Sequence, residues 1–104
     1  MQITAKTNGD GTVLELNGRL VMGSDLIELR DAVWDATGKH PKKIILNLAH
    51  VTYVDSCGVG ELVNTFKHVK KQGAHLVLTE LPRRVRTLLD AARLTPIFEV
   101  SDSE

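Results

Sequence analysis

The chain has 104 residues, and its 13 basic and 13 acidic side chains give a formal net charge of zero. This length predicts one domain with a core of useful size, and the neutral balance creates no field that would favour nucleic acid or an anionic membrane as a partner. The single cysteine excludes an internal disulfide, and no apolar stretch approaches the ~20 residues that cross a bilayer. Because the N-terminus also lacks a signal-peptide pattern, we expect a cytoplasmic protein.

The chain opens with a predicted strand pair. Residues 3–7 alternate in polarity, and residues 12–17 form a second run of strand type. Asn8-Gly9-Asp10-Gly11 between them is a strong hairpin signal. Gly18 is predicted to end the second strand, which leaves residues 19–23 as a loop that exposes several apolar side chains.

A helix is predicted after this loop. Ser24 or Asp25 supplies its N-terminal cap, and Gly38 stops it. Its core face carries apolar residues at helical spacing, namely Leu26, Leu29, Val33 and Ala36. Pro41 then keeps the chain extended into residues 42–48, which have the length and β-branched content of a buried strand.

The chain is organised around residues 51–63, which read V-T-Y-V-D-S-C-G-V-G-E-L-V. Apolar residues recur at helical spacing from Val59 to Val69, and a polar turn at residues 55–58 separates this predicted helix from the strand before it. Asp and Ser are good N-caps, because their side-chain oxygens accept hydrogen bonds from the unpaired amides of a first helical turn. The hydroxyl of Ser56 is therefore predicted at or beside the positive end of a helix.

The last part of the chain continues the alternation of strands and helices. Gly73 is a predicted left-handed helix stop, residues 75–79 a strand, and Pro82 the first turn of a third helix with Val85, Leu88, Leu89 and Ala92 inward. A turn and a short extended piece follow. The order β-β-α-β-α-β-α-(β) predicts one α/β domain over residues 1–100, with helices packed against a small mixed sheet, and a short tail at residues 101–104.

The candidates for chemistry around Ser56 are weak. Ser56 lacks the G-x-S-x-G pattern of a nucleophile elbow, and Asp55 is adjacent to it rather than linked through a histidine. A helix N-terminus lowers a thiol pKa, which leaves a redox role open for Cys57, but a small residue tolerated in a tight turn is the favoured interpretation. Gly58-Val59-Gly60 lacks the third glycine of a dinucleotide fingerprint, and we interpret its glycines as letting the helix sit close.

Charged and histidine side chains elsewhere give no catalytic or metal signal. The four histidines, His40, His50, His68 and His75, show no metal-ligand spacing, and His68 is expected on a solvated helix face. The arginines of the third helix form either a docking face or a solvated face. We therefore expect no catalytic residue, no cofactor and no metal, and interpret the chain as a binding domain with one well-placed serine.

The central motif resembles the signature of the STAS-domain family, specifically of the bacterial anti-sigma factor antagonists. That signature is an apolar residue, Asp, Ser, a small residue, Gly, an apolar residue and a small residue. Residues 17–20, 44–48 and 88–98 resemble further parts of the family, so the resemblance covers nearly the whole chain. Two departures are Cys57, where relatives often have Ser or Ala, and Val21, where they often have Asp.

The resemblance implies a phosphorylation switch in signal transduction and transcription regulation. In the family, the serine at the position of Ser56 is phosphorylated by an anti-sigma factor with a histidine-kinase-like ATPase fold that acts as a serine kinase. The unphosphorylated form binds that partner and frees its sigma factor, the phosphorylated form does not bind, and a PP2C-type phosphatase restores the first form. This is partner switching. We expect the partner-binding surface to comprise Asp55, Ser56, Cys57, Gly58, Val59 and Glu61, with Leu20, Met22 and Ser24 from the preceding loop.

An alternative stays open within the same family. The chain could be a STAS scaffold, or the regulatory subunit of a stress-sensing or transport complex, that is never phosphorylated. The intact Asp-Ser-x-Gly motif at residues 55–58 favours the switch over the scaffold.

Overall fold

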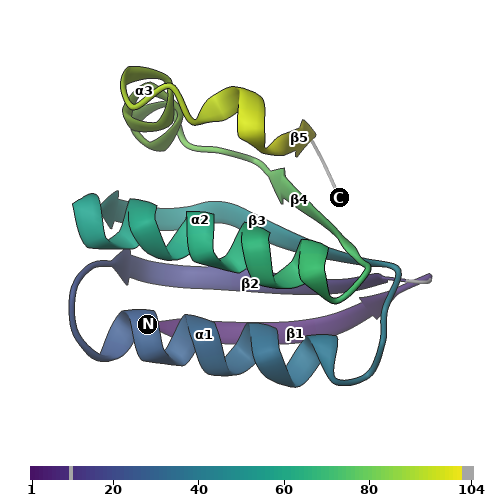
Figure 1. Cartoon of the computed structure of the whole chain (residues 1–104). Helices are drawn as coiled ribbons and strands as arrows, with labels where there is room; N and C mark the ends of the chain where they lie inside the picture. Colours follow the sequence, from purple (N-terminus) through teal and green to yellow (C-terminus); the bar gives the residue numbers. More distant parts are fainter. Residues whose placement is uncertain (10, 102–104) are drawn as a thin grey trace.

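The computed structural model describes residues 1–9 and 11–101, which form one five-stranded sheet and three α-helices (Figure 1). In chain order the elements are β1 (Gln2–Asn8), β2 (Gly11–Leu20), α1 (Ser24–Thr37), β3 (Lys43–Val54), α2 (Ser56–Lys71), β4 (His75–Thr79), α3 (Arg83–Ala91), the short 3-10 helix η1 (Thr95–Ile97) and β5 (Glu99–Ser101). The predicted order of elements is confirmed, including the last short strand.

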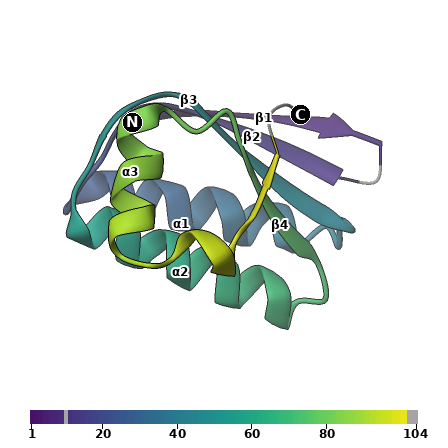
Figure 2. The ribbon, with the colours of Figure 1, turned by 90° about the horizontal axis from the view of Figure 1, so that it is seen from above.

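The topology places the starts of two helices at one end of the sheet. The strands lie in the order β1-β2-β3-β4-β5; β1 is antiparallel to β2, and the other neighbours are parallel. Because β2-α1-β3 and β3-α2-β4 are successive crossovers in the same direction, α1 and α2 lie side by side over one face of the sheet (Figure 2). Both helices begin where β2 and β3 end, so the β2–α1 connection lies beside the start of α2.

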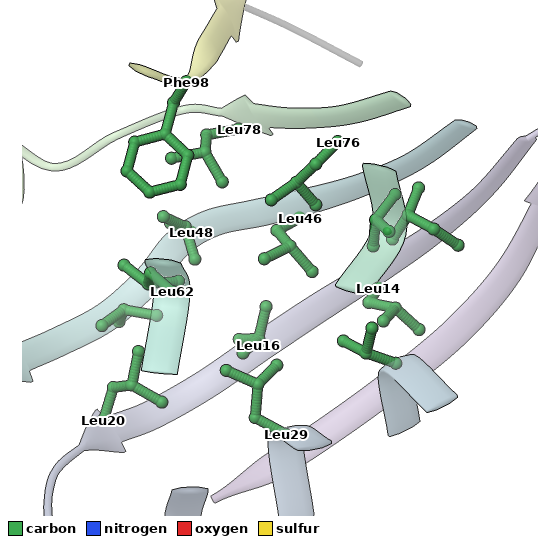
Figure 3. Packing of buried hydrophobic residues seen from close by; sticks show 14 of the residues in the cluster. Leu14, Leu16, Leu20, Leu29, Leu46, Leu48, Leu62, Leu76, Leu78 and Phe98 are labelled. Carbon is green, nitrogen blue, oxygen red and sulfur yellow. The ribbon is translucent and has the colours of Figure 1, made fainter. Parts of the chain in front are cut away.

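The core lies between the sheet and these helices. Strand side chains alternate between the two faces, so every second residue of β2, β3 and β4 points toward the helices. Fully or almost fully buried side chains from all three strands and from α1 and α2 meet there (Figure 3): Leu14, Leu16, Leu46, Leu48, Leu78, Leu29 and Leu62. Each such leucine contributes about 1.5–3 kcal/mol through burial. The core therefore fixes both helices on the sheet and sets where α2 begins.

Strands β2 and β3 both continue well past their predicted C-terminal ends. Gly18 does not end β2; it adopts φ 130° at a register shift against β3, and the strand continues to Leu20. β3 likewise runs on to Val54 instead of stopping at Leu48. Pairing between these two strands outweighs the local turn signal of the glycine, because each added residue satisfies backbone groups of both strands.

The predicted C-terminal ends of α1 and α2 are confirmed, but the predicted N-terminal cap of α1 is not. Gly38 is the C-cap of α1, and Gly73 has the left-handed conformation expected of a stop (φ 83°). The predicted cap of α1 is wrong: Gly23 is the N-cap residue and no side chain caps the helix. Ser24 is its first residue, and Asp25 accepts a hydrogen bond from the Met1 ammonium at 3.0 Å.

The ends of the chain and of the hairpin are only partly described. Asn8 pairs with Gly11 across the predicted hairpin, whereas Asp10 lies outside the described residues. Ser101 is the last residue of β5, and the rest of the predicted tail, residues 102–104, also lies outside them. Ala92, expected to point inward from α3, follows the helix end and is exposed.

Candidate functional site

Asp55 caps the helix that follows the central strand. Its backbone is extended (φ −97°, ψ −178°), and its Oδ1 accepts a hydrogen bond from the Gly58 N–H at 2.8 Å. Ser56 is the first residue of α2 and is exposed. The predicted placement of the Ser56 hydroxyl at the positive end of a helix is therefore confirmed.

The same carboxylate also holds the connection between β2 and α1. Asp55 Oδ2 accepts a hydrogen bond from the Met22 N–H at 3.0 Å, and the Asp55 N–H donates to the Leu20 carbonyl at 3.2 Å. The amides of Met22 and then of Gly58 lower the pKa of Asp55, because hydrogen bonds from backbone donors favour the charged carboxylate. Asp55 thus joins two segments that are 33 residues apart in the sequence.

Gly58 lets α2 pack directly on the end of β2. A Cβ atom at this position would lie 2.1 Å from the Leu20 carbonyl oxygen and 2.9 Å from Val54 Cγ1, so no larger residue fits without movement. At Gly60 a Cβ atom would meet nothing within 4 Å. The interpretation that glycines bring the helix close is confirmed for Gly58 and is wrong for Gly60.

The exposed part of the site comes from the β2–α1 connection and from the starts of α1 and α2. Ser56 and Ser24 are exposed, Met22 is 72% exposed, and Cys57 and Val59 are partly buried. Leu20 is a correction: as the last residue of β2 its side chain is fully buried in the core, so the expectation that it exposes an apolar surface is wrong. Met22 is the most exposed apolar residue of this connection, and Val21 is partly buried.

Glu61 is also placed differently from the expectation. Its side chain is 3% exposed and forms a two-pronged ion pair with Arg30 of α1, with Oε1 2.6 Å from Nη2 and Oε2 3.4 Å from Nε. This carboxylate hydrogen-bonds to the Arg30 guanidinium and raises its pKa. Glu61 therefore braces α2 against α1 within the chain, and little of it is left on the surface for a partner.

A second contact between these helices lies near their C-terminal ends. The rings of Trp34 and His68 stack with centroids 3.4 Å apart and planes 7° apart, and a His68 ring nitrogen lies 2.9 Å from Thr37 Oγ1. Burial, and to a lesser extent the charge of Lys71, lower the pKa of His68. The expectation of a solvated His68 is therefore wrong. Trp34 and His68 lie far apart in the sequence, so local sequence patterns do not predict their contact.

The described residues contain no metal-type cluster of side chains and no helix suited to cross a membrane. No group of three or more His, Cys, Asp and Glu side chains that could hold a metal ion occurs within residues 1–9 and 11–101. Over the same ranges, no helix combines the length and the apolar character needed to span a membrane.

The fold and this site define a small α/β domain with an exposed serine beside a capping aspartate at the start of a helix. The sequence matches the STAS domain family over residues 2–104, and the chain belongs to that family. The predicted family is thereby confirmed.

Individual relatives differ in how much of the chain they match. An anti-sigma-B factor antagonist of Bacillus subtilis is 46% identical over 54 residues, which are 52% of this chain and 50% of that protein, so the match spans about half its length. A STAS-domain containing protein of Pseudomonas aeruginosa is 28% identical over 103 residues, 97% of this chain and 100% of that protein. A crystal structure of a candidate anti-sigma factor antagonist from Thermotoga maritima matches with a TM-score of 0.87 at 25% identity, over 97% of this chain and 86% of that one.

Proposed function

We propose that this protein is an anti-sigma factor antagonist controlled by phosphorylation of Ser56. The unphosphorylated form binds an anti-sigma factor that has a histidine-kinase-like ATPase fold and is also a serine kinase, and so releases the sigma factor. Phosphorylation by that partner ends binding, and a PP2C-type phosphatase reverses it. The observation that carries this proposal is the exposed Ser56 at the first position of α2, directly after Asp55, whose carboxylate holds the backbone of the exposed Met22.

Physical chemistry supports phosphorylation without unfolding. A phosphate adds a charge of about −1.5 to −2, and the start of a helix favours negative charge. Ser56 is exposed, so the phosphate displaces no buried group. The folded domain should therefore tolerate the modification.

The same charge would oppose binding. It would lie beside the Asp55 carboxylate, which also accepts a hydrogen bond from the backbone of the exposed, apolar Met22, in a surface that a partner must desolvate. Burying an uncompensated charge at an interface costs several kcal/mol, and a loss of ~3 kcal/mol weakens binding more than a hundredfold. That difference is large enough for a switch.

The relatives support the general role. Membership of the STAS family and the similarity to a Bacillus subtilis protein named as an anti-sigma-B factor antagonist favour binding to an anti-sigma factor. The partner-binding surface proposed here consists of Ser24, Asp55, Ser56, Cys57 and Val59 with Met22, while Gly58 and Glu61 support it from within.

The test is intact-mass measurement after incubation with ATP and the cognate anti-sigma factor. A gain of about 80 Da, one phosphate, is expected for the wild type and for Ser24→Ala, but not for Ser56→Ala. Ser24 is a matched control, because it is also an exposed serine at the first position of a helix. Tight binding with no added mass in the presence of ATP would instead favour the unphosphorylated scaffold.

A further inference from the structure

The β2–α1 connection has few restraints of its own. Met22 and Gly23 lie on the surface, Gly23 has φ 119° with nothing within 4 Å of a Cβ position, and no side chain caps α1 behind it. Yet Met22 is 72% exposed, and its backbone nitrogen lies 3.0 Å from Oδ2 of Asp55, the residue before α2. Within the connection only Val21 is partly buried, so the position of Met22 also depends on contacts from neighbouring segments.

Asp55 supplies the restraint. The Leu20 carbonyl is fixed by the N–H of Asp55, the N-cap residue of α2, and by the close approach of Gly58, but these contacts end at the last residue of β2. Beyond it, the hydrogen bond of 3.0 Å from the Met22 N–H to Asp55 Oδ2 ties the connection to the residue that precedes Ser56. One carboxylate therefore sets the position of both α2 and Met22.

We propose that Asp55 is a positioning residue that holds Met22 beside Ser56, so that the two form one partner-binding surface in which Met22 is the apolar anchor. This inference rests on the proposed function. The partner that fits is a protein with an apolar pocket next to the site that binds the Ser56 hydroxyl. Methionine suits such a pocket, because its unbranched, polarisable side chain adapts to the shape it enters.

The substitution Asp55→Asn separates the two tasks of the carboxylate. Asparagine is as good an N-cap as aspartate, and its amide oxygen can still accept the hydrogen bond from the Gly58 N–H. Its amide nitrogen, however, is only a donor and cannot accept one from the Met22 N–H. The variant should therefore keep α2 and release Met22.

The first measurement is amide hydrogen exchange by NMR on the protein alone. In Asp55→Asn we expect the Met22 amide to exchange about tenfold faster, while the amides of α2 keep their wild-type rates. An unchanged exchange rate at Met22 would show that Asp55 does not hold this amide, and would overturn the proposal. Faster exchange throughout α2 would mean that Asp55 acts only as a helix cap, which would overturn it as well.

The second measurement is affinity for the anti-sigma factor. Asp55→Asn and Met22→Ala should each weaken binding about tenfold, or ~1.4 kcal/mol, and the double variant should lose little more, because both changes remove the same anchor. Ile97→Ala, which also shortens an exposed apolar side chain but lies in η1 and outside the proposed surface, should bind like the wild type. Additive losses would overturn the shared role. If the wild type itself fails to bind, both the proposed function and the role of Met22 as an anchor are wrong. The exchange experiment would still test whether Asp55 holds Met22 in place.

Discussion

Replacing Gly58 by alanine should destabilise the protein, although alanine is normally the better helix former. In an open helical position the change would gain up to about 1 kcal/mol. Here the new Cβ would lie 2.1 Å from a backbone carbonyl oxygen, that of Leu20, where ordinary contacts begin near 3.4 Å. Either α2 or the end of β2 must move by more than about 1 Å, and overpacking of this kind costs about 1–3 kcal/mol. Since the better helix propensity offsets up to about 1 kcal/mol of this cost, we expect a net loss of about 1–2 kcal/mol.

Urea unfolding followed by far-ultraviolet circular dichroism measures this loss. With a slope of about 1–3 kcal/mol per molar urea, the Gly58→Ala midpoint should fall by about 0.3–2 M. Gly60→Ala is the matched control, two residues further along α2, where a Cβ meets nothing within 4 Å; its midpoint should stay or rise. If the two variants are equally stable, the packing of α2 against the Leu20 carbonyl is not what requires the glycine.

Two further predictions concern the contacts between α1 and α2. The fluorescence of Trp34, the one tryptophan of the chain, should change when the stacked His68 is protonated, with a midpoint below the ordinary His pKa of about 6.5. Neutral His68 should contribute its full stability to the fold above that pH, and this contribution should be lost as the pH falls through the lowered pKa. A midpoint at or above 6.5, or the same titration in His68→Phe, would contradict the stacked, partly buried imidazole. Arg30→Leu should lower the urea midpoint because it leaves the buried Glu61 carboxylate unpaired, and adding Glu61→Leu should recover much of the loss; strictly additive losses would show that the pair is not coupled.

The parts of the site that depend on neighbouring residues could be predicted from the sequence. The polarity pattern located α2, and the preference of aspartate for helix starts located the cap beside Ser56, because a helix start is determined within about one turn of chain. The glycine at residue 73 likewise shows its effect within its own turn. Such signals need no knowledge of what lies across the fold.

The contacts between distant segments could not be predicted in this way. Leu20 appeared to lie in an exposed loop because Gly18 carries a turn signal, and only the pairing of β2 with β3 extends the strand and buries that leucine. The hydrogen bond from Met22 to Asp55 crosses 33 positions, and the ion pair between Arg30 and Glu61 crosses 31. A single sequence contains no direct record of such pairs.

One signal could have indicated the contacts between the helices. Arg30, Trp34 and Thr37 recur at spacings that share one side of α1, and Glu61 and His68 share one side of α2. Two parallel helices on the same sheet face, as the crossovers predict, bring such sides together. Polar residues at helical spacing on both helices are therefore worth pairing before they are assigned to solvent.

Phosphate on Ser56 is expected to turn partner binding off while the fold remains intact. The most direct measurement compares the affinity of the cognate anti-sigma factor, by calorimetry, for the wild type, for Ser56→Ala and for protein carrying phosphoserine at position 56, with circular dichroism on each. We predict identical folding, near wild-type affinity for Ser56→Ala, and at least a hundredfold weaker binding, ~3 kcal/mol, for the phosphorylated form. Equal affinity for the phosphorylated and unphosphorylated proteins would contradict the switch.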